Sequence, residues 1–309
     1  MLAAVLRAFF LWLSDRRWLA GVALGTPLLR RMPLRFVAGT TLEAAIAAVR
    51  SLNAVGASAT LDVLGESVGD RASADRAAAA YVDAIERIAA EGLDANVSIK
   101  LSQMGLELGL ETCVAVMGPV VVAGSRHHVF VRVDMESSAS TERTLEVVRR
   151  LRAEGHDVGP VIQSYLHRSP ADVERLAVER VRTRICKGAY AESPEVAHQE
   201  RAVVGDAFVA LCERLLEADA YPGVATHDPD MIERVGDFAR GRGIGHDRFE
   251  FQMLYGVRRD LQRTLLDQGY RLRIYVPYGT EWYPYFMRRL AERPANVLFV
   301  LRSVFGERS

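Results

Sequence analysis

The chain has 309 residues, half of them hydrophobic, and is therefore long enough to bury one substantial core. Arginine plus lysine and aspartate plus glutamate both number 39, a balance that argues against a general nucleic-acid-binding protein. The cysteines, Cys113, Cys186 and Cys212, are few and widely spaced, which argues against a disulfide framework and favours the reducing cytoplasm.

The N-terminal segment, residues 1–13, is apolar apart from one arginine. It is shorter than the roughly 20 residues that span a bilayer, and no small-residue cleavage site follows it, so we expect neither a transmembrane helix nor a signal peptide. It is either an interfacial helix, with Phe9, Phe10 and Trp12 on its apolar face, or an arm packed on the core. The first alternative would add peripheral contact with the inner face of the cell membrane to a cytoplasmic location.

A rhythm of short apolar runs and amphipathic stretches begins near residue 59. A helix over Thr41–Leu52 precedes it, so we divide the chain into an N-terminal helical arm, residues 1–58, and one domain, residues 59–309. The apolar runs are rich in β-branched and aromatic residues, which is typical of buried parallel strands. They are Ala59–Leu64, Val97–Leu101, Val129–Val133, Pro160–Tyr165, Arg182–Cys186, Gly223–Thr226, Phe249–Leu254 and Leu272–Val276.

Helical patterns lie between most of these runs. The predicted helices are Asp75–Glu91, Ser140–Arg152, Pro194–Glu217, Pro229–Arg240, Arg259–Gln268 and Tyr283–Arg293. Eight strands that alternate with helices favour an α/β fold, a closed (β/α)8 barrel of the TIM type with a short N-terminal helical extension. An open doubly wound sheet is the alternative, but its G-x-G-x-x-G fingerprint after the first strand is missing.

Polar side chains gather at the carboxyl ends of the predicted strands, where a barrel enzyme builds its active site. A charge in an apolar strand is costly unless it is paired, so Lys100, Asp134 and Arg184 could form a purely structural cluster. Their concentration at one end favours a functional site over that alternative. The polar residues at these ends include Lys100, Asp134, Gln163, Arg184, Lys187, Thr226, His227, Gln252 and Tyr275.

Lysine is rare in this chain. Only Lys100 and Lys187 are lysine, so the other 37 of the 39 basic residues are arginine. One explanation is codon bias toward arginine, with the two lysines retained by chance. The other is that these two positions need a compact ammonium group. A Schiff-base aldolase, with either lysine as the nucleophile, is therefore an alternative function, as is a non-catalytic anion-binding protein. His227 has no clustered partner, so no metal site is predicted.

The last predicted helix presents Tyr285, Arg288, Arg289 and Glu292 on one face. Two adjacent arginines can bind a carboxylate, and the aromatic ring beside them can contact the apolar part of the same ligand. Such a pair is more often a solvated helix face. Its position directly after the eighth strand, at the mouth of the barrel, favours a functional role.

These motifs together resemble the proline dehydrogenase family, from about residue 59 to the C-terminus. One departure is Cys186, where relatives often carry valine, and we assign it no role. The matching strings are Ser98-Ile-Lys-Leu-Ser102, Arg132-Val-Asp-Met-Glu136, Ile162-Gln-Ser-Tyr165, Arg184-Ile-Cys-Lys-Gly-Ala-Tyr190, Ala225-Thr-His-Asp228, Phe249-Glu-Phe-Gln252, Arg273-Ile-Tyr275 and Tyr285-Phe-Met-Arg-Arg289.

The resemblance implies FAD bound at the barrel mouth without a Rossmann fold. Gln163 would hydrogen-bond the flavin ring, and Arg184 would lie near its N5, the hydride acceptor. The cofactor-binding residues that the resemblance implies are Met135, Gln163, Arg184, Lys187, Gly188, Ala189, Thr226 and His227.

The resemblance also implies the reaction, which is oxidation of L-proline to Δ1-pyrroline-5-carboxylate, with electrons passed to a membrane quinone. Asp134 and Arg184 would be catalytic, with Asp134 orienting and charge-balancing Lys100. Tyr275 favours proline over hydroxyproline, because hydroxyproline-specific relatives carry a smaller residue there. The implied substrate-binding residues are Lys100, Tyr275, Tyr285, Arg288 and Arg289.

Overall fold

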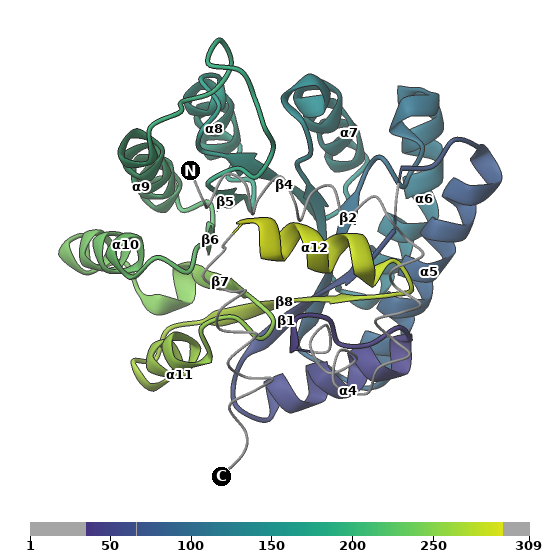
Figure 1. Ribbon diagram of the computed structural model, residues 1–309, viewed down its shortest axis with the longest axis horizontal. Helices are drawn as coiled ribbons and strands as arrows, with labels where there is room; N and C mark the ends of the chain where they lie inside the picture. Colours follow the sequence, from purple (N-terminus) through teal and green to yellow (C-terminus); the bar gives the residue numbers. More distant parts are fainter. Residues whose placement is uncertain (1–34, 66, 293–309) are drawn as a thin grey trace.

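The computed structural model describes residues 35–65 and 67–292, apart from the side chains of residues 288–292. Within these residues, eight parallel strands close into a barrel in chain order, which confirms the predicted fold (Figure 1). The strands are β1 (Ser58–Val63), β2 (Ala95–Lys100), β3 (Val131–Asp134), β4 (Val158–Gln163), β5 (Arg184–Cys186), β6 (Gly223–Ala225), β7 (Glu250–Leu254) and β8 (Leu272–Tyr278).

The barrel closes where β1 pairs with β8, in parallel register from Ser58 opposite Arg273 to Val63 opposite Tyr278. Closure leaves no free strand edge, so every strand has two neighbours. The carboxyl ends of all eight strands therefore face the same end of the barrel, where their polar side chains converge.

Helices surround the barrel, and the predicted ones are present with ends shifted by a few residues. They are α4 (Leu42–Asn53), α5 (Arg71–Ala90), α6 (Leu110–His127), α7 (Thr141–Ala153), α8 (Ser169–Val178), α9 (Arg201–Glu217), α10 (Pro229–Gly241), α11 (Arg259–Asp267) and α12 (Trp282–Glu292). Two of them, α6 and α8, are not among the predicted helices. The largest shift is in α9, which begins at Arg201 rather than Pro194 because Ala197 forms a β-bridge with Leu166.

The described part of the N-terminal arm packs on the barrel. Helix α4 begins after Thr41, whose hydroxyl accepts the N–H of Ala44, and it buries Ala45, Ile46 and Val49 in the main core. Residues 1–13 lie outside the described residues. No helix in the described part of the chain is long and apolar enough to cross a membrane.

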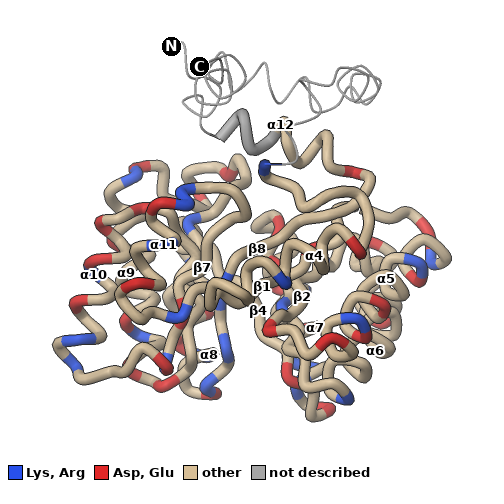
Figure 2. The backbone as a smooth tube through the Cα atoms, turned by 90° about the horizontal axis from the view of Figure 1, so that it is seen from below, with Lys and Arg blue, Asp and Glu red and all other residues tan. Residues whose placement is uncertain are grey.

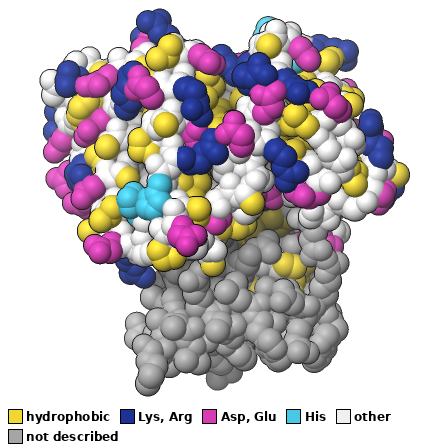
Figure 3. Space-filling view, turned by 90° about the horizontal axis from the view of Figure 1, so that it is seen from above, with side chains coloured by type: hydrophobic (Ala, Val, Ile, Leu, Met, Phe, Trp, Pro, Cys, Tyr) yellow, Lys and Arg dark blue, Asp and Glu magenta, His cyan; other side chains and the backbone are white. Residues whose placement is uncertain are grey.

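Helix α12 crosses one end of the barrel and follows directly after β8 (Figures 1 and 2). It therefore covers the end at which the strands finish. Acidic and basic side chains are interspersed on the face shown in Figure 3, as the balanced composition leads one to expect.

Candidate active site

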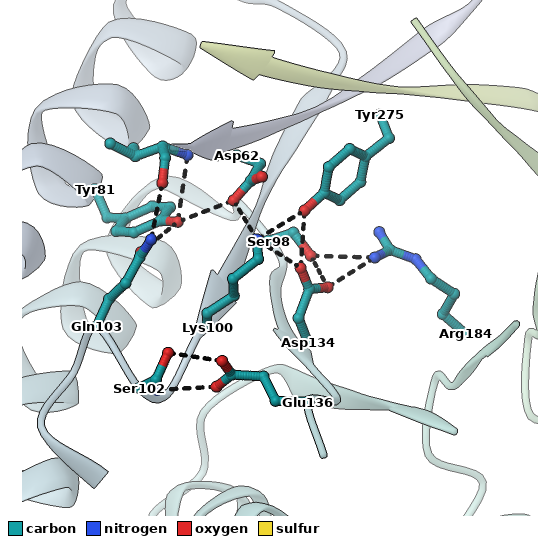
Figure 4. Close-up of polar contacts among 11 residues, drawn as sticks. Asp62, Tyr81, Ser98, Lys100, Ser102, Gln103, Asp134, Glu136, Arg184 and Tyr275 are labelled. Carbon is teal, nitrogen blue, oxygen red and sulfur yellow. Dashed lines mark hydrogen bonds and ion pairs between the residues drawn. The ribbon is translucent and has the colours of Figure 1, made fainter. Parts of the chain in front are cut away.

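Asp134 is the centre of a hydrogen-bonded cluster at the carboxyl ends of the strands (Figure 4). Its Oδ1 accepts from Ser98 Oγ at 2.5 Å and from Arg184 Nη1 at 2.9 Å. Its Oδ2 accepts from Tyr275 Oη at 2.8 Å and from Lys100 Nζ at 3.4 Å. Burial raises the pKa of Asp134, but the charges of Lys100 and Arg184 outweigh burial, and the pKa lies below its ordinary value. The carboxylate is therefore ionised, as four donors require.

Lys100 lies between two carboxylates. Its Nζ is 2.8 Å from Asp62 Oδ1 and 3.4 Å from Asp134 Oδ2, and it donates to Tyr275 Oη at 3.2 Å. Burial lowers the pKa of Lys100, but the charges of Asp62 and Asp134 raise it by more than burial lowers it. The pKa therefore lies above its ordinary value. A Schiff-base nucleophile needs a neutral amine, so this environment disfavours the aldolase alternative for Lys100.

Tyr275 forms one wall of the cluster. The centroid of its ring lies 5.2 Å from the guanidinium carbon of Arg184 and 5.9 Å from Lys100 Nζ, within the range of cation–π attraction. Burial, followed by the charge of Asp134, raises the pKa of Tyr275 well above its ordinary value. The phenol therefore stays a neutral hydrogen-bond donor, and its ring offers an apolar surface to a ligand.

Gln163, at the end of β4, has an amide whose orientation is fixed. Its Nε2 donates to the backbone carbonyl of Glu136 at 2.6 Å, and Glu136 is itself held by the backbone N–H and hydroxyl of Ser102 at 3.0 and 2.6 Å. The buried Oε1 of Gln163 has no hydrogen-bond partner within the described residues. A buried acceptor without a donor costs about 1–3 kcal/mol, so this position suits a ligand that presents an N–H group.

The loop after β5 approaches its neighbours closely. Gly188 has a φ of 110°, and a Cβ there would lie 2.4 Å from the ring of Tyr165, so both backbone and space require glycine. Lys187 Nζ pairs with Asp228 Oδ2 at 3.0 Å, which links this loop to the start of α10. Ala189 is exposed. These contacts hold the loop after β5 against Tyr165 and against the start of α10.

The segment after β6 brings Thr226 and His227 to the same end. Thr226 is buried, and its Oγ1 accepts the backbone N–H of Asp228 at 3.1 Å. His227 Nε2 accepts the backbone N–H of Leu254 at 2.9 Å. A ring nitrogen that accepts carries no proton, so this arrangement holds the imidazole as the neutral tautomer with its proton on Nδ1.

The remaining predicted residues lie on β3 and α12. Met135 follows β3 and is buried, and Tyr285 is buried on α12. Arg288 and Arg289 belong to α12, but their side chains lie outside the described residues. The predicted carboxylate-binding pair on α12 therefore stays a prediction.

Asp62 belongs to the cluster but is absent from the predicted site. It is fully buried on β1, and Tyr81 Oη lies 3.5 Å from its Oδ1. Its Oδ2 has no partner in the described part of the chain. The sequence does contain one signal that could have identified Asp62. It is an acid within the apolar run Ala59–Leu64, and a buried charge needs a partner.

Comparisons with known proteins assign the chain to a family. A sequence model of the family described as proline dehydrogenase matches residues 45–302. The chain belongs to the proline dehydrogenase family. Proline dehydrogenase 1 of Bacillus subtilis subsp. natto is 40% identical over 302 residues, which are 97% of this chain and 99% of that protein. Proline dehydrogenase of Deinococcus radiodurans is 42% identical over 275 residues, 87% of this chain and 89% of that protein.

The barrel is also similar to part of a larger protein. The crystal structure of proline utilization A from Bdellovibrio bacteriovorus, inactivated by N-propargylglycine, superposes with a TM-score of 0.81 at 24% identity. The match covers 91% of this chain and 34% of that one, so this chain spans about a third of that protein. At this identity the likeness shows the shared fold alone.

Proposed function

We propose that this member of the proline dehydrogenase family oxidises L-proline to Δ1-pyrroline-5-carboxylate, with FAD as its cofactor. The observation that carries the proposal is the charged cluster of Lys100, Asp134, Arg184 and Tyr275 beside the open acceptor of Gln163. The near full-length similarity to two proline dehydrogenases supports the same reaction. The reaction would be the first step of proline degradation to glutamate.

The residues at the mouth fit a flavin. Gln163 Oε1 is buried without a donor within the described residues, so it can accept a ring N–H. When bound, FAD would supply the redox chemistry by accepting the hydride lost from proline. The residues that would hold it are Met135, Gln163, Arg184, Lys187, Gly188, Ala189, Thr226 and His227.

The substrate would lie between the cations and the aromatic walls. Cations on its carboxylate orient the pyrrolidine ring and disfavour a positive charge on its nitrogen. Hydride loss from C5 needs the nitrogen lone pair, so both effects favour the reactive form. Arg184 would stabilise the negative charge that develops during the transfer. The proline-binding residues would be Lys100, Tyr275, Tyr285, Arg288 and Arg289.

A membrane quinone would be the electron acceptor, as is usual in the family. This would bring the cytoplasmic protein to the inner face of the cell membrane, with residues 1–13 as the peripheral contact. The direct test compares liposome binding of the full chain and of a chain without these residues. Equal binding would contradict a role for the segment.

The proposed reaction is tested by an anaerobic absorbance spectrum of the purified protein, before and after addition of L-proline. Flavin bands that bleach with proline are the expected result. Bands that do not bleach would contradict proline as the substrate. A protein that shows no flavin bands after incubation with FAD would contradict the cofactor.

A further inference from the structure

A buried row of polar side chains adjoins Arg184 and is not used by the proposed reaction. Gln252 Oε1 accepts a hydrogen bond from Arg184 Nε, and Gln252 Nε2 donates to Glu250 Oε1 at 2.6 Å. Arg273 Nε donates to the same oxygen of Glu250 at 2.7 Å. We propose that Gln252 and Glu250 are positioning residues, which fix the orientation of the Arg184 guanidinium toward the cofactor.

The order of donors and acceptors allows the Gln252 amide only one orientation. Burial raises the pKa of Glu250, but the charge of Arg273 lowers it by more than burial raises it. The pKa therefore lies below its ordinary value. An ionised carboxylate only accepts, so the Gln252 NH₂ group must face Glu250 and the carbonyl oxygen must face Arg184. Arg273 is itself held by the carbonyl of Ala59 at 2.7 Å, which anchors the row to β1.

Gly223 provides the space for this row. It lies on β6, opposite Arg184 on one side and opposite Glu250 on the other. A Cβ at Gly223 would lie 2.4 Å from Gln252 Nε2, and no left-handed φ explains the glycine. A side chain at position 223 would therefore displace Gln252, which gives a second way to disturb the row without altering a polar group.

Gln252 and the Asp134 cluster together hold the Arg184 guanidinium at two of its three nitrogens. Gln252 holds Nε, while Asp134 and Ser98 hold Nη1 at 2.9 and 3.2 Å. Nη2 makes no hydrogen bond within the described part of the chain, and it is the group left to face a ligand. This inference rests on the proposed function, because the ligand is the flavin of that proposal.

The experiment compares Gln252→Leu and Gly223→Ala with Thr60→Val. The control removes a buried hydrogen bond between Thr60 and Asn96, neither of which forms a hydrogen bond with Arg184, Gln252 or Glu250 within the described residues. In the first two variants we expect flavin reduction by L-proline to slow by about tenfold to a hundredfold, because Arg184 is no longer held in place. The dissociation constant of tetrahydrofuran-2-carboxylate, a proline-shaped acid without the ring nitrogen, should change by less than about twofold. The midpoint potential of the bound flavin should become more negative, because the reduced form loses a well-placed cation.

Gln252→Glu provides a variant of nearly unchanged volume. It sets a second carboxylate against Glu250 in place of the amide donor. We expect it to lower the reduction rate and the flavin potential, as Gln252→Leu does.

Two results would overturn the positioning role. One is a reduction rate and flavin potential for Gln252→Leu and Gly223→Ala that match those of Thr60→Val. The other is a Gln252→Glu variant whose reduction rate and flavin potential equal those of the wild type. Failure of the wild-type chain to bind FAD, or of its flavin to bleach with proline, would instead contradict the proposed function, so the two failures are distinguishable.

Discussion

At the scale of single residues, Asp134 and Asp62 differ in how many donors each accepts. Both oxygens of Asp134 accept two donors each, whereas Asp62 Oδ2 has no partner within the described residues. Asp134→Asn places one NH₂ group against two donors, whichever way the amide turns. We expect the free energy of unfolding to fall by about 3–5 kcal/mol, measured by urea unfolding. We expect kcat/KM for proline to fall by at least about a hundredfold.

Asp62→Asn is the matched control for that variant. It keeps Oδ1 as the acceptor for Lys100, and its NH₂ group can take the place of Oδ2. It removes a charge but no hydrogen bond, so we expect a loss of about 1–2 kcal/mol. Equal losses in the two variants would mean that charge alone, rather than the four accepted hydrogen bonds, determines the stability of the cluster.

Tyr275 is the residue at which substrate specificity can be tested. Its hydroxyl is engaged by Asp134 and Lys100, so the ring cannot turn away to admit a larger substrate. We expect steady-state turnover of L-proline to exceed that of hydroxyproline by at least about tenfold. Tyr275→Ser should narrow this ratio by opening space, and faster turnover of hydroxyproline by the wild type would contradict the specificity.

At the scale of elements, Glu192 joins two loops of the proposed cofactor site. Its carboxylate accepts the backbone N–H and the hydroxyl of Ser138 at 2.7 and 2.6 Å, which ties the loop after β3 to the loop after β5. Glu192→Ala removes both bonds, so we expect the dissociation constant for FAD to rise by about tenfold, measured by fluorescence titration of the apoprotein. Glu195→Ala is the control, because Glu195 lies exposed in the same loop and makes no hydrogen bond within the described residues. Equal affinities in the two variants would show that Glu192 does not order the cofactor site.

The strands could be predicted from the sequence more completely than the helices. Each predicted apolar run overlaps an observed strand, because buried parallel strands are continuous in hydrophobicity. The sequence of helix α6 has a weak helical signal, because it contains Pro119 and many β-branched residues. The helix is stabilised instead by packing on α5. Helix α8 buries the polar Ser169 and Asp172 together with Val173 and Ala177, so its buried face has no continuous apolar period.

The site could be predicted as a set of strand ends but not as a network. Lys100, Asp134, Arg184 and Tyr275 converge because the strands that carry them finish at one end of the barrel. Asp62 also lies near a strand end, but its position inside the apolar run Ala59–Leu64 hides this, and its contact with Lys100 depends on the register of β1 beside β2. A sequence pattern identifies which face a strand residue takes but not the distance between two strands.

At the scale of the whole molecule, ion pairs at two levels offset most of the charge that the barrel interior contains. The level at the mouth, within the described residues, combines two acids and two bases, namely Asp62, Asp134, Lys100 and Arg184. The deeper level pairs Glu250 with Arg273. Within each of these pairings the charges cancel. Arg132 is also buried, and its guanidinium donates instead to the backbone carbonyls of Pro160 and Arg182. An anionic substrate would add one negative charge at the mouth, and Arg288 and Arg289 of α12 are the proposed source of the compensating charge.

The same ion pairs make the stability of the barrel sensitive to acid. The pKa values of Asp134 and Glu250 are lowered in the folded chain, where nearby cations outweigh burial. Their contribution is therefore fully present above the unfolded values of about 4 and is lost as the pH falls through the folded values. Chemical unfolding of the wild type and of Glu250→Gln measures this. We expect parallel stability curves above about pH 6, and below about pH 4 a wild-type slope that is steeper by up to about 1.4 kcal/mol per pH unit. Curves that stay parallel throughout would mean that Glu250 does not stabilise the barrel as a carboxylate.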